Sequence, residues 1–377
     1  MEKITLDDVF IALNKIYKDL PKKKLFSKNI KKINFSDIIK EPLIIKNNIP
    51  PYNQSAMDGI GVKAINNKYI IKGKTYLNKF NKTNISKEEC LIVKTGSLIS
   101  NNIRYIIPIE KIFKKGNTYH LLDYNFKKSF IRPKGHIFKK NHKIVFNNHR
   151  LTLKDFMAIR SINNLDVKLK SKLKFKIIST GSEFTNNHFI RPSNAEYLKS
   201  IILRYKQEVE ENIHVIDNQS LILKEIKKSK SDLTIIIGGT GKSDDDIKFD
   251  KFNLKIDGLD LKPGRPFKYL LYSKKLFLFF PGNPCSSFVL TNILIKSLIY
   301  KYCYNSYLAP DMVVNTSDIK YNYSTLPRKT FLFGFIQNKK IKIFKDQESS
   351  NLSNILYSNC LIYYDKTNEL KVFKLND

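Results

Sequence analysis

Residues 232–246 read DLTIIIGGTGKSDDD, and the fold that we predict for the whole chain starts from this stretch. The run from Leu233 to Ile237 is apolar without alternation. Such a run is typical of a strand that is buried on both faces of a parallel sheet. It ends at Gly238 and Gly239, where glycine permits a sharp turn and lets a ligand approach the backbone closely. Open α/β sheets bind their ligands at this carboxyl end of the strands.

Three consecutive aspartates close the stretch, at positions 244–246. Carboxylates of this kind hold a divalent cation beside a phosphate in many sites. A solvated acidic loop explains them equally well, because the stretch has neither the spacing of a P-loop nor that of a dinucleotide fingerprint. The stretch alone therefore leaves a ligand site and a simple loop as open alternatives.

The bulk composition predicts a globular protein of more than one domain. The chain has 377 residues and is 42% hydrophobic, which is enough for two or more cores. We find no apolar run long enough to span a bilayer and no signal peptide at the amino end. The cysteines are scattered, without a CxxC pair, at Cys90, Cys285, Cys303 and Cys360. A reducing cytoplasm and no membrane association are therefore expected.

The net charge of +33 allows two interpretations. Such a charge attracts a polyanion such as RNA or DNA. Lysine, isoleucine and asparagine are, however, abundant along the whole chain, as a genome rich in A and T would produce. The lysines are not gathered into one arm, so we favour the compositional explanation. We expect salt-dependent, nonspecific binding to nucleic acid and no specific nucleic-acid partner.

The amino-terminal part of the chain indicates a helix followed by a small β-rich region. An amphipathic helix is predicted from the stripe of Val9, Phe10, Leu13 and Ile16. Two prolines at 50 and 51 force an extended path that leads to Asp58, which is either a turn residue or a carboxylate presented into a cleft. Short β runs follow at residues 69–71, 90–93 and 105–109, and residues 151–162 have a helical pattern.

From Leu173 the pattern becomes α/β. Predicted strands at 173–179, 212–216, 233–237 and 276–280 alternate with helices near 193–203, 218–228 and 285–302. Such alternation predicts a parallel sheet, and the loops at Gly181, Gly238 and Pro281 should converge on one edge of it. Residues 331–336, 341–344 and 360–364 then predict a separate β region at the carboxyl end.

Taken together, the motifs of this chain resemble those of the molybdopterin molybdenumtransferase family, which includes the C-terminal domain of gephyrin. Single motifs are weak, whereas SAMDG, KPGxP and PGNP in this order over nearly the whole chain are specific. The matching segments are PYNQSAMDG at 51–59, TG at 95–96, STGSE at 179–183, GGTG at 238–241 with Asp246, KPGRP at 262–266 and PGNP at 281–284.

The resemblance implies an elongated α/β subunit with additional β domains that forms a homodimer. We expect a central parallel-sheet α/β domain at 173–305, a β-rich lid at 46–132 and a C-terminal β barrel at 306–377. Residues 1–45 together with 133–172 would form a linker and dimerisation domain. The resemblance also allows a contact with the molybdopterin adenylyltransferase.

The implied reaction inserts molybdate into adenylylated molybdopterin, with release of AMP and with Mg²⁺ assisting. The family pattern assigns catalytic roles to Asp58, Asp246, Lys262 and Arg265, of which the two cations suit oxyanions. Asp58, Glu183 and Asp246 would bind the metal. Binding of nucleotide and pterin would fall to Thr95, Glu183, Asp217, Gly238, Gly239, Pro281, Pro284 and Ser286. Asp217 also reads as a cap of the next helix. The helix after Pro284 would offer its amino end to an anion.

The chain departs from the family pattern at a few positions. Ser182 stands where a second acid is often found, and His136 and Ile137 stand where an acidic pair is usual. Glu348 replaces a usual glycine. Lowered activity is therefore one expectation. The alternatives are an activity of the molybdopterin adenylyltransferase type, which the lid and C-terminal β part argue against, and a basic scaffold or nucleic-acid-binding protein with a degraded active site. His136, His142 and His149 do not have the spacing of a metal site.

Overall fold

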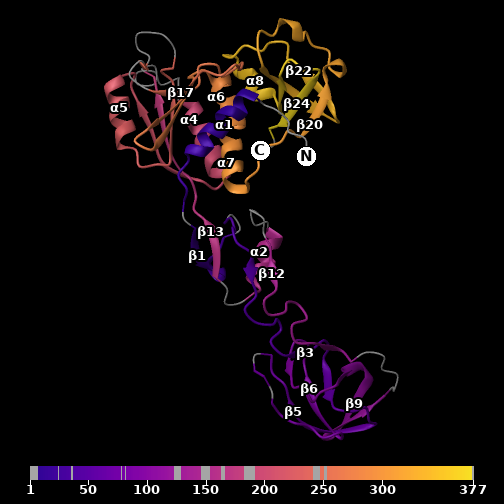
Figure 1. Cartoon of the computed structure of the whole chain (residues 1–377). Coiled ribbons are helices and arrows are strands. Elements are labelled where there is room, and N and C mark those ends of the chain that lie inside the picture. The colour runs from indigo at the N-terminus through magenta and orange to yellow at the C-terminus, as the bar shows by residue number, and fades with distance from the viewer. Residues whose placement is uncertain are drawn as a thin grey trace.

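The computed structural model describes residues 7–23, 25–34, 37–77, 79–80, 82–122, 129–145, 153–162, 166–181, 192–240, 247–249 and 253–375. The chain is elongated, and its parts follow one another along the long axis (Figure 1). An α/β part and the C-terminal β part lie together at one end. A narrow middle part connects them to a β-rich part at the other end.

The α/β part is built on a six-stranded sheet with the order β15-β14-β16-β19-β18-β17. Its first four strands are parallel, as the alternation of predicted elements requires. They are β15 (Glu208–Val215), β14 (Lys174–Thr180), β16 (Leu233–Ile237) and β19 (Lys275–Phe280). Among the described residues of this part, the helices are α1 (Asp7–Asp19), α4 (Ser193–Arg204), α5 (Gln219–Lys228), α6 (Pro284–Leu290) and α7 (Lys296–Tyr304).

Helices cover both faces of this sheet, and β16 is buried along its whole length as predicted. On one face, Leu233, Ile235 and Ile237 pack in a core with α1, α4, α6 and α7. On the other face, Ile236 packs with Ile222 and Ile226 of α5. Each large apolar side chain buried in this way contributes roughly 1.5–3 kcal/mol relative to exposure. In α1, Val9, Leu13 and Ile16 are buried as the stripe predicts, whereas the side chain of Phe10 lies outside the description.

Two features of the α/β part differ from the prediction. The sheet continues beyond β19 into the antiparallel strands β18 (Lys268–Tyr272) and β17 (Leu254–Asp257), which the sequence pattern did not indicate. The predicted helix at 285–302 is interrupted by a π-helical turn, Thr291–Ile295, between α6 and α7. A π turn needs one extra residue per turn and leaves no periodic signal of its own.

The β-rich part confirms the three predicted strands and adds others. Its six-stranded sheet has the order β8-β4-β6-β5-β10-β9. The strands are β4 (Gly59–Val62), β5 (Lys68–Lys74), β6 (Glu89–Val93), β8 (Tyr105–Pro108), β9 (Ile112–Lys115) and β10 (Thr118–Leu121). A smaller sheet beside it contains β11 (Ile131–Arg132), β3 (Asn53–Ser55) and β7 (Leu98–Ile99).

The described residues of the middle part include two short strand pairs and an α-helix. They are β1 (Leu25–Asn29) with β13 (Asp166–Lys170), β2 (Leu43–Ile44) with β12 (Lys143–Ile144), and α2 (Leu153–Arg160). A core of nine buried apolar residues, among them Ile30, Ile39 and Leu169, holds these pieces together. The middle part therefore has a core of its own, separate from those of the α/β and β-rich parts.

The C-terminal part is an antiparallel five-stranded sheet with the order β20-β24-β23-β21-β22. The predicted strands are present, as β21 (Thr330–Gln337), β22 (Lys340–Ile343) and β23 (Cys360–Tyr364). The pattern missed β20 (Met312–Asn315), β24 (Glu369–Lys374) and the helix α8 (Leu352–Tyr357). Phe331 and Phe333 of β21 belong to the core of the α/β part, so the two parts share one apolar interface.

Candidate active site

Loops from three parallel strands meet at the carboxyl edge of the α/β sheet, as predicted. Gly238 follows β16 and donates a backbone hydrogen bond of 3.0 Å to the carbonyl of Phe280, the last residue of β19. A Cβ on Gly238 would lie 2.7 Å from the carbonyl oxygen of Thr180, the last residue of β14, and its φ is +105°. A Cβ on Gly282 would lie 3.5 Å from the Cα of Gly238. Only glycine fits at position 238, because any side chain would close this contact between strands.

The PGNP segment is held by Asn283. Its Oδ1 caps α6 by accepting a hydrogen bond of 3.4 Å from the amide of Ser286, and Pro284 occupies the first turn of the helix. Its Nδ2 donates to the hydroxyl of Ser349 at 3.1 Å, in the turn that precedes α8. Asn283 therefore ties the α/β loop to the C-terminal part.

The amino end of α6 has less free capacity for an anion than the sequence implied. The amide of Cys285 donates to the carbonyl of Ser349, that of Ser286 to Asn283 Oδ1, and that of Ser287 to the carbonyl of Asn283. These groups are therefore engaged within the protein. Ser286 is itself buried, 5% exposed. The local role of the PGNP segment in this structure is to connect two parts of the chain.

Lys262 reaches the same region from the KPGRP segment. The backbone of Lys262 bonds on both sides to the C-terminal part, with its amide donating to Lys329 O at 2.9 Å and its carbonyl accepting from Phe331 N at 2.7 Å. Its exposed side chain lines a pocket of about 480 Å³. The other lining residues form one turn of the C-terminal part: Lys345, Asp346, Gln347, Glu348, Ser349 and Ser350. Arg265 is exposed three residues further on and does not line this pocket.

Asp58 and Thr95 form a pair in the β-rich part. The pairing of Gly59 with Val93 in β4 and β6 places the residues that flank these strand ends beside each other. Asp58 Oδ1 accepts hydrogen bonds from the backbone amide of Thr95 at 2.6 Å and from its hydroxyl at 2.8 Å. The hydrogen bond from the Thr95 amide lowers the pKa of Asp58 most, and the bond from the Thr95 hydroxyl lowers it next. The charge of Lys94 makes a smaller contribution in the same direction. The carboxylate is exposed and ionised, as a ligand for a cation must be.

Replacing Thr95 with valine is expected to raise the pKa of Asp58 part of the way toward its ordinary value. The substitution removes the hydroxyl and keeps the amide, which is the larger cause. A folded-state pKa that is lowered keeps the carboxylate ionised to lower pH, so the variant should become protonated at higher pH than the parent. NMR titration of the Asp58 carboxyl measures this, and Thr83→Val provides a control. An unchanged titration would show that the hydroxyl does not act on Asp58.

The structure does not bring all the predicted site residues together. Asp58 follows β3 and Thr95 follows β6 in the β-rich part. This part lies at the opposite end of the elongated molecule from α6 and α8 (Figure 1). Asp217 lies between β15 and α5, and Asn218 rather than Asp217 is the cap of α5, with Oδ1 accepting from Leu221 N at 3.1 Å. Glu183 and Asp246, together with Ser182 and residues 244–245, lie outside the described residues.

The structure offers no complete metal site among the residues that it describes. Within them no three His, Cys, Asp or Glu side chains gather closely enough to hold an ion. Two of the three candidate metal ligands, Glu183 and Asp246, lie outside that part of the chain. The ring centres of His142 and Phe138 lie 5.3 Å apart, and His149 lies outside the described residues.

Sequence reasoning missed the bridge between Asn283 and Ser349 and the place of Lys345 in the pocket. The signal for Asn283 was available, because an asparagine directly before a proline is a favoured cap of a helix that begins with that proline. Lys345 carried no signal, since it is one lysine among many in a chain with 67 lysines and arginines. Only the packing of the C-terminal part on the α/β part reveals it.

Comparisons with known proteins agree with this architecture. A family model described as the MoeA N-terminal region (domain I and II) matches residues 11–162, and a model described as a probable molybdopterin binding domain matches residues 176–301. A molybdopterin molybdenumtransferase from Haemophilus influenzae is 25% identical over 320 residues, 79% of this chain and 77% of that protein. The chain belongs to the molybdopterin molybdenumtransferase family.

Other members of the molybdopterin molybdenumtransferase family show the extent of the likeness. One from Synechocystis sp. is 28% identical over 222 residues, 53% of this chain, and the match spans 56% of that relative's length. The crystal structure of a molybdopterin biosynthesis MoeA protein from Pyrococcus horikoshii has a TM-score of 0.76 at 18% identity and covers 99% of this chain and 100% of that one. The fold is therefore the mixed α/β, multi-domain fold of this family. None of the helices within the described ranges is long and apolar enough to cross a membrane.

Proposed function

We propose that this protein inserts molybdate into adenylylated molybdopterin, releases AMP and yields molybdenum-bound molybdopterin. The observation that carries the proposal is the pocket that Lys262 of the KPGRP segment forms with a turn of the C-terminal part. Molybdate and phosphates are oxyanions, and a lysine ammonium provides a point charge with three donors for them. The hydroxyls of Ser349 and Ser350 line the same pocket and can supply neutral hydrogen bonds.

The carboxyl edge of the sheet would hold the nucleotide and pterin. Gly239 leaves half-buried backbone at this edge without a side chain beside the buried Gly238, and both have positive φ values. In this proposal Asp217, Ser286, Pro281 and Pro284 frame the same edge, and Arg265 holds a phosphate. Asp58, Glu183 and Asp246 would hold Mg²⁺, which would supply positive charge against the phosphates. The dithiolene sulfurs belong to the substrate, so in this proposal no protein cysteine takes part, and all four cysteines are buried thiols.

The active site of this proposal needs a second copy of the chain. Asp58 and Thr95 flank β4 and β6 of the β-rich part. That part lies at the other end of the molecule from the α/β and C-terminal parts, whose residues line the pocket of Lys262 (Figure 1). A homodimer in which the lid of one subunit faces the α/β part of the other would unite them. We retain the proposed division into residues 1–45 with 133–172, 46–132, 173–305 and 306–377, with a barrel in the last. A cytoplasmic location and a contact with the adenylyltransferase also remain proposals.

Glu348→Gln is expected to lower the KM for molybdate several-fold. Glu348 lines the pocket of Lys262, so its carboxylate stands near the place of an incoming oxyanion and repels it. The amide keeps the shape of the side chain and removes its charge. Steady-state rates at several molybdate concentrations measure the change, with Glu369→Gln on β24 as the matched control. A KM that stays the same would place the oxyanion elsewhere.

The proposed function is tested by mixing the purified protein with adenylylated molybdopterin, Mg²⁺ and molybdate at low concentration. AMP release and molybdenum incorporation are then followed together. Both appearing in parallel supports the transferase reaction. Binding of the pterin without AMP release, or no binding at all, contradicts it. Formation of adenylylated molybdopterin from ATP would instead indicate the adenylyltransferase activity.

A further inference from the structure

The middle and β-rich parts together are joined to the α/β part by two passes of the chain. The chain leaves the α/β part after α1, at residues 20–23, and returns at residues 171–173 directly before β14. We call the described residues between 25 and 170 the arm, and the α/β and C-terminal parts together the body. The position of the arm, which carries Asp58, relative to any site in the body therefore depends in part on how these two passes are held.

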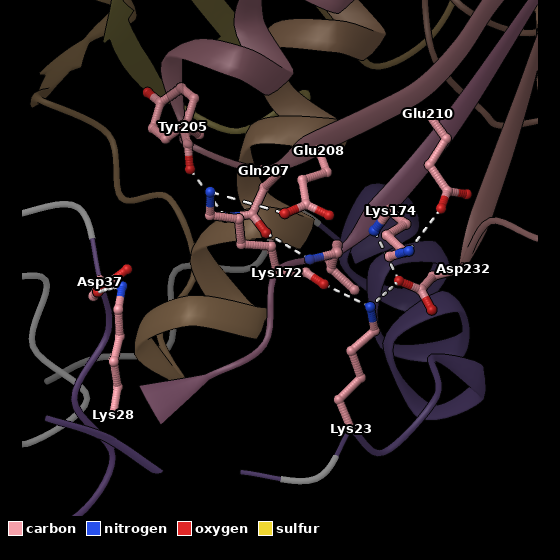
Figure 2. Close-up of polar contacts among 11 residues, drawn as sticks. Lys23, Lys28, Asp37, Lys172, Lys174, Tyr205, Gln207, Glu208, Glu210 and Asp232 are labelled. Atoms are coloured by element: carbon pink, nitrogen blue, oxygen red, sulfur yellow. Dashed lines mark hydrogen bonds and ion pairs between the residues drawn. The ribbon is translucent and has the colours of Figure 1, made fainter. Parts of the chain in front are cut away.

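The first attachment is an ion pair between the outgoing pass, directly before the arm, and the body. Lys23 Nζ lies 2.5 Å from Asp232 Oδ2, and the two side chains are only 15% and 14% exposed. The same ammonium donates to the carbonyl of Lys172 at 2.6 Å, so it links the outgoing pass to the returning one. Asp232 Oδ2 also accepts from the amide of Lys174 at 2.7 Å. Figure 2 shows Lys23, Asp232, Lys172 and Lys174 converging in this way.

The second attachment lies at the carboxyl end of α7. Lys40 Nζ donates to the carbonyl of Cys303 at 3.4 Å, and Lys170 Nζ donates to that of Tyr302. Lys170 Nζ also lies 3.6 Å from the centre of the Tyr302 ring, and Tyr302 Oη donates to Ser171 O at 2.6 Å. The last carbonyls of a helix carry partial negative charge, so two ammonium groups are stabilised there.

The arm presents these two lysines as one unit. The amide of Lys170 donates to Ile38 O at 3.0 Å, and that of Lys40 to Lys168 O at 3.0 Å. The returning pass is held further where Leu173 N donates to Gln207 Oε1 at 2.9 Å. Burial first, and the neighbouring charge of Lys40 second, lower the pKa of Lys170 to about 8. The ammonium groups of Lys40 and Lys170 repel each other, and the carbonyls at the end of α7 offset this repulsion only while they stay close to both groups. The contact therefore favours one orientation of the arm relative to the body.

We propose that these two attachments form a joint that positions the arm, and with it Asp58, at a fixed angle to the body. We define the joint as Lys23, Lys40, Lys170, Asp232 and Tyr302. It lies at the amino edge of the parallel strands, because Asp232 directly precedes β16 and α7 returns from β19. The pocket of Lys262 belongs to the loops at the other edge. Joint residues therefore act on the proposed reaction only by positioning the arm. This role in the reaction rests on the proposed function, whereas the rigidity of the joint is independent of it.

Distance measurement between spin labels tests the joint directly. Labels are placed on Lys114→Cys in β9 of the arm and on Lys224→Cys in α5 of the body, both exposed, while the four native cysteines are buried. Double electron–electron resonance is recorded on the full chain diluted with unlabelled protein, so that a dimer contributes one labelled copy. The intact chain should give one narrow distribution. Lys23→Met with Lys170→Met should broaden it about twofold or more, as expected of a freed hinge.

Matched variants separate the joint from a general loss of structure. Lys28→Met removes the pair of Lys28 with Asp37, 3.2 Å apart within the arm (Figure 2), and should leave the distribution unchanged. Lys23→Arg keeps the positive charge. This single variant, with Lys170 unchanged, should give the same narrow distance distribution as the intact chain. Circular dichroism confirms that each variant is folded, and Asp232→Asn replaces Lys23→Met if that variant unfolds. An unchanged distribution in the folded double variant overturns the joint, whatever the activity assay gives.

Discussion

Replacing Lys262 with alanine is expected to slow molybdenum insertion by about 10²-fold, the loss typical of removing one donor from a preorganised anion site. The side chain of Lys262 is exposed and lines the pocket, whereas its backbone is fixed by hydrogen bonds to Lys329 and Phe331. The substitution therefore removes a charge and leaves the local chain in place. Its effect should appear mainly with limiting molybdate, because the ammonium acts on the oxyanion and not on the pterin ring.

The rate of AMP release and the molybdenum content of the product measure this effect. Lys224→Ala, on the exposed face of α5, is the control, since it removes one positive charge without touching the pocket. Both variants have the same net charge, so a difference between them reports position and not overall charge. Equal rates for Lys262→Ala and the parent chain would remove the pocket from the reaction.

The sequence pattern predicted those strands and helices whose apolar residues form a continuous run or a regular stripe within the element itself. The run from Leu233 to Ile237 is apolar throughout because both faces of β16 are covered, and this can be read without a structure. The segments 254–257 and 268–272 mix lysines with apolar residues, and the sequence pattern did not indicate them as strands. In the structure β18 pairs with β19, and β17 pairs with β18 at the edge of the sheet. Edge strands gain their conformation from the neighbouring strand, which a local pattern does not contain.

The sequence predicted the separate motifs of the candidate site but not their positions relative to one another in space. Asp58 and Thr95 were each singled out, but their hydrogen bond follows from the register of Gly59 with Val93, residues far apart in the sequence. The distance between this pair and Lys262 depends on the joint around Lys23 and Asp232. Both lysines and aspartates are common at exposed positions, so nothing in their local sequence marks a pair that is nearly buried.

The register of β4 also explains why Gly59 should be the most sensitive position in the β-rich part. A Cβ on this residue would lie 1.9 Å from the carbonyl oxygen of Ile107, a backbone atom of the neighbouring strand β8, and φ is +155°. Backbone cannot move aside as a flexible side chain would. Gly59→Ala should therefore separate β4 from β8 and destabilise this part by about 3 kcal/mol or more, in the range reserved for severe clashes.

Gly116 provides a matched comparison within the same sheet. It lies in the turn between β9 and β10 with φ +58°, and a Cβ there would meet nothing within 4 Å. Gly116→Ala carries only the strain of a left-handed residue, about 1 kcal/mol. The chain has several cores, so global unfolding curves are not two-state, and amide hydrogen exchange in β4, β6 and β8 is the better measurement. Protection should fall sharply for Gly59→Ala and slightly for Gly116→Ala.

Because Asp58 directly precedes Gly59, the same clash should undo its pair with Thr95. Separation of β4 from its neighbours removes the register that brings Thr95 to Asp58, so the pKa of this carboxyl should rise toward its ordinary value in Gly59→Ala. If protection and the Asp58 titration both remain as in the parent chain, β8 accommodates the methyl group and the geometry of β4 is not what holds the carboxylate in place.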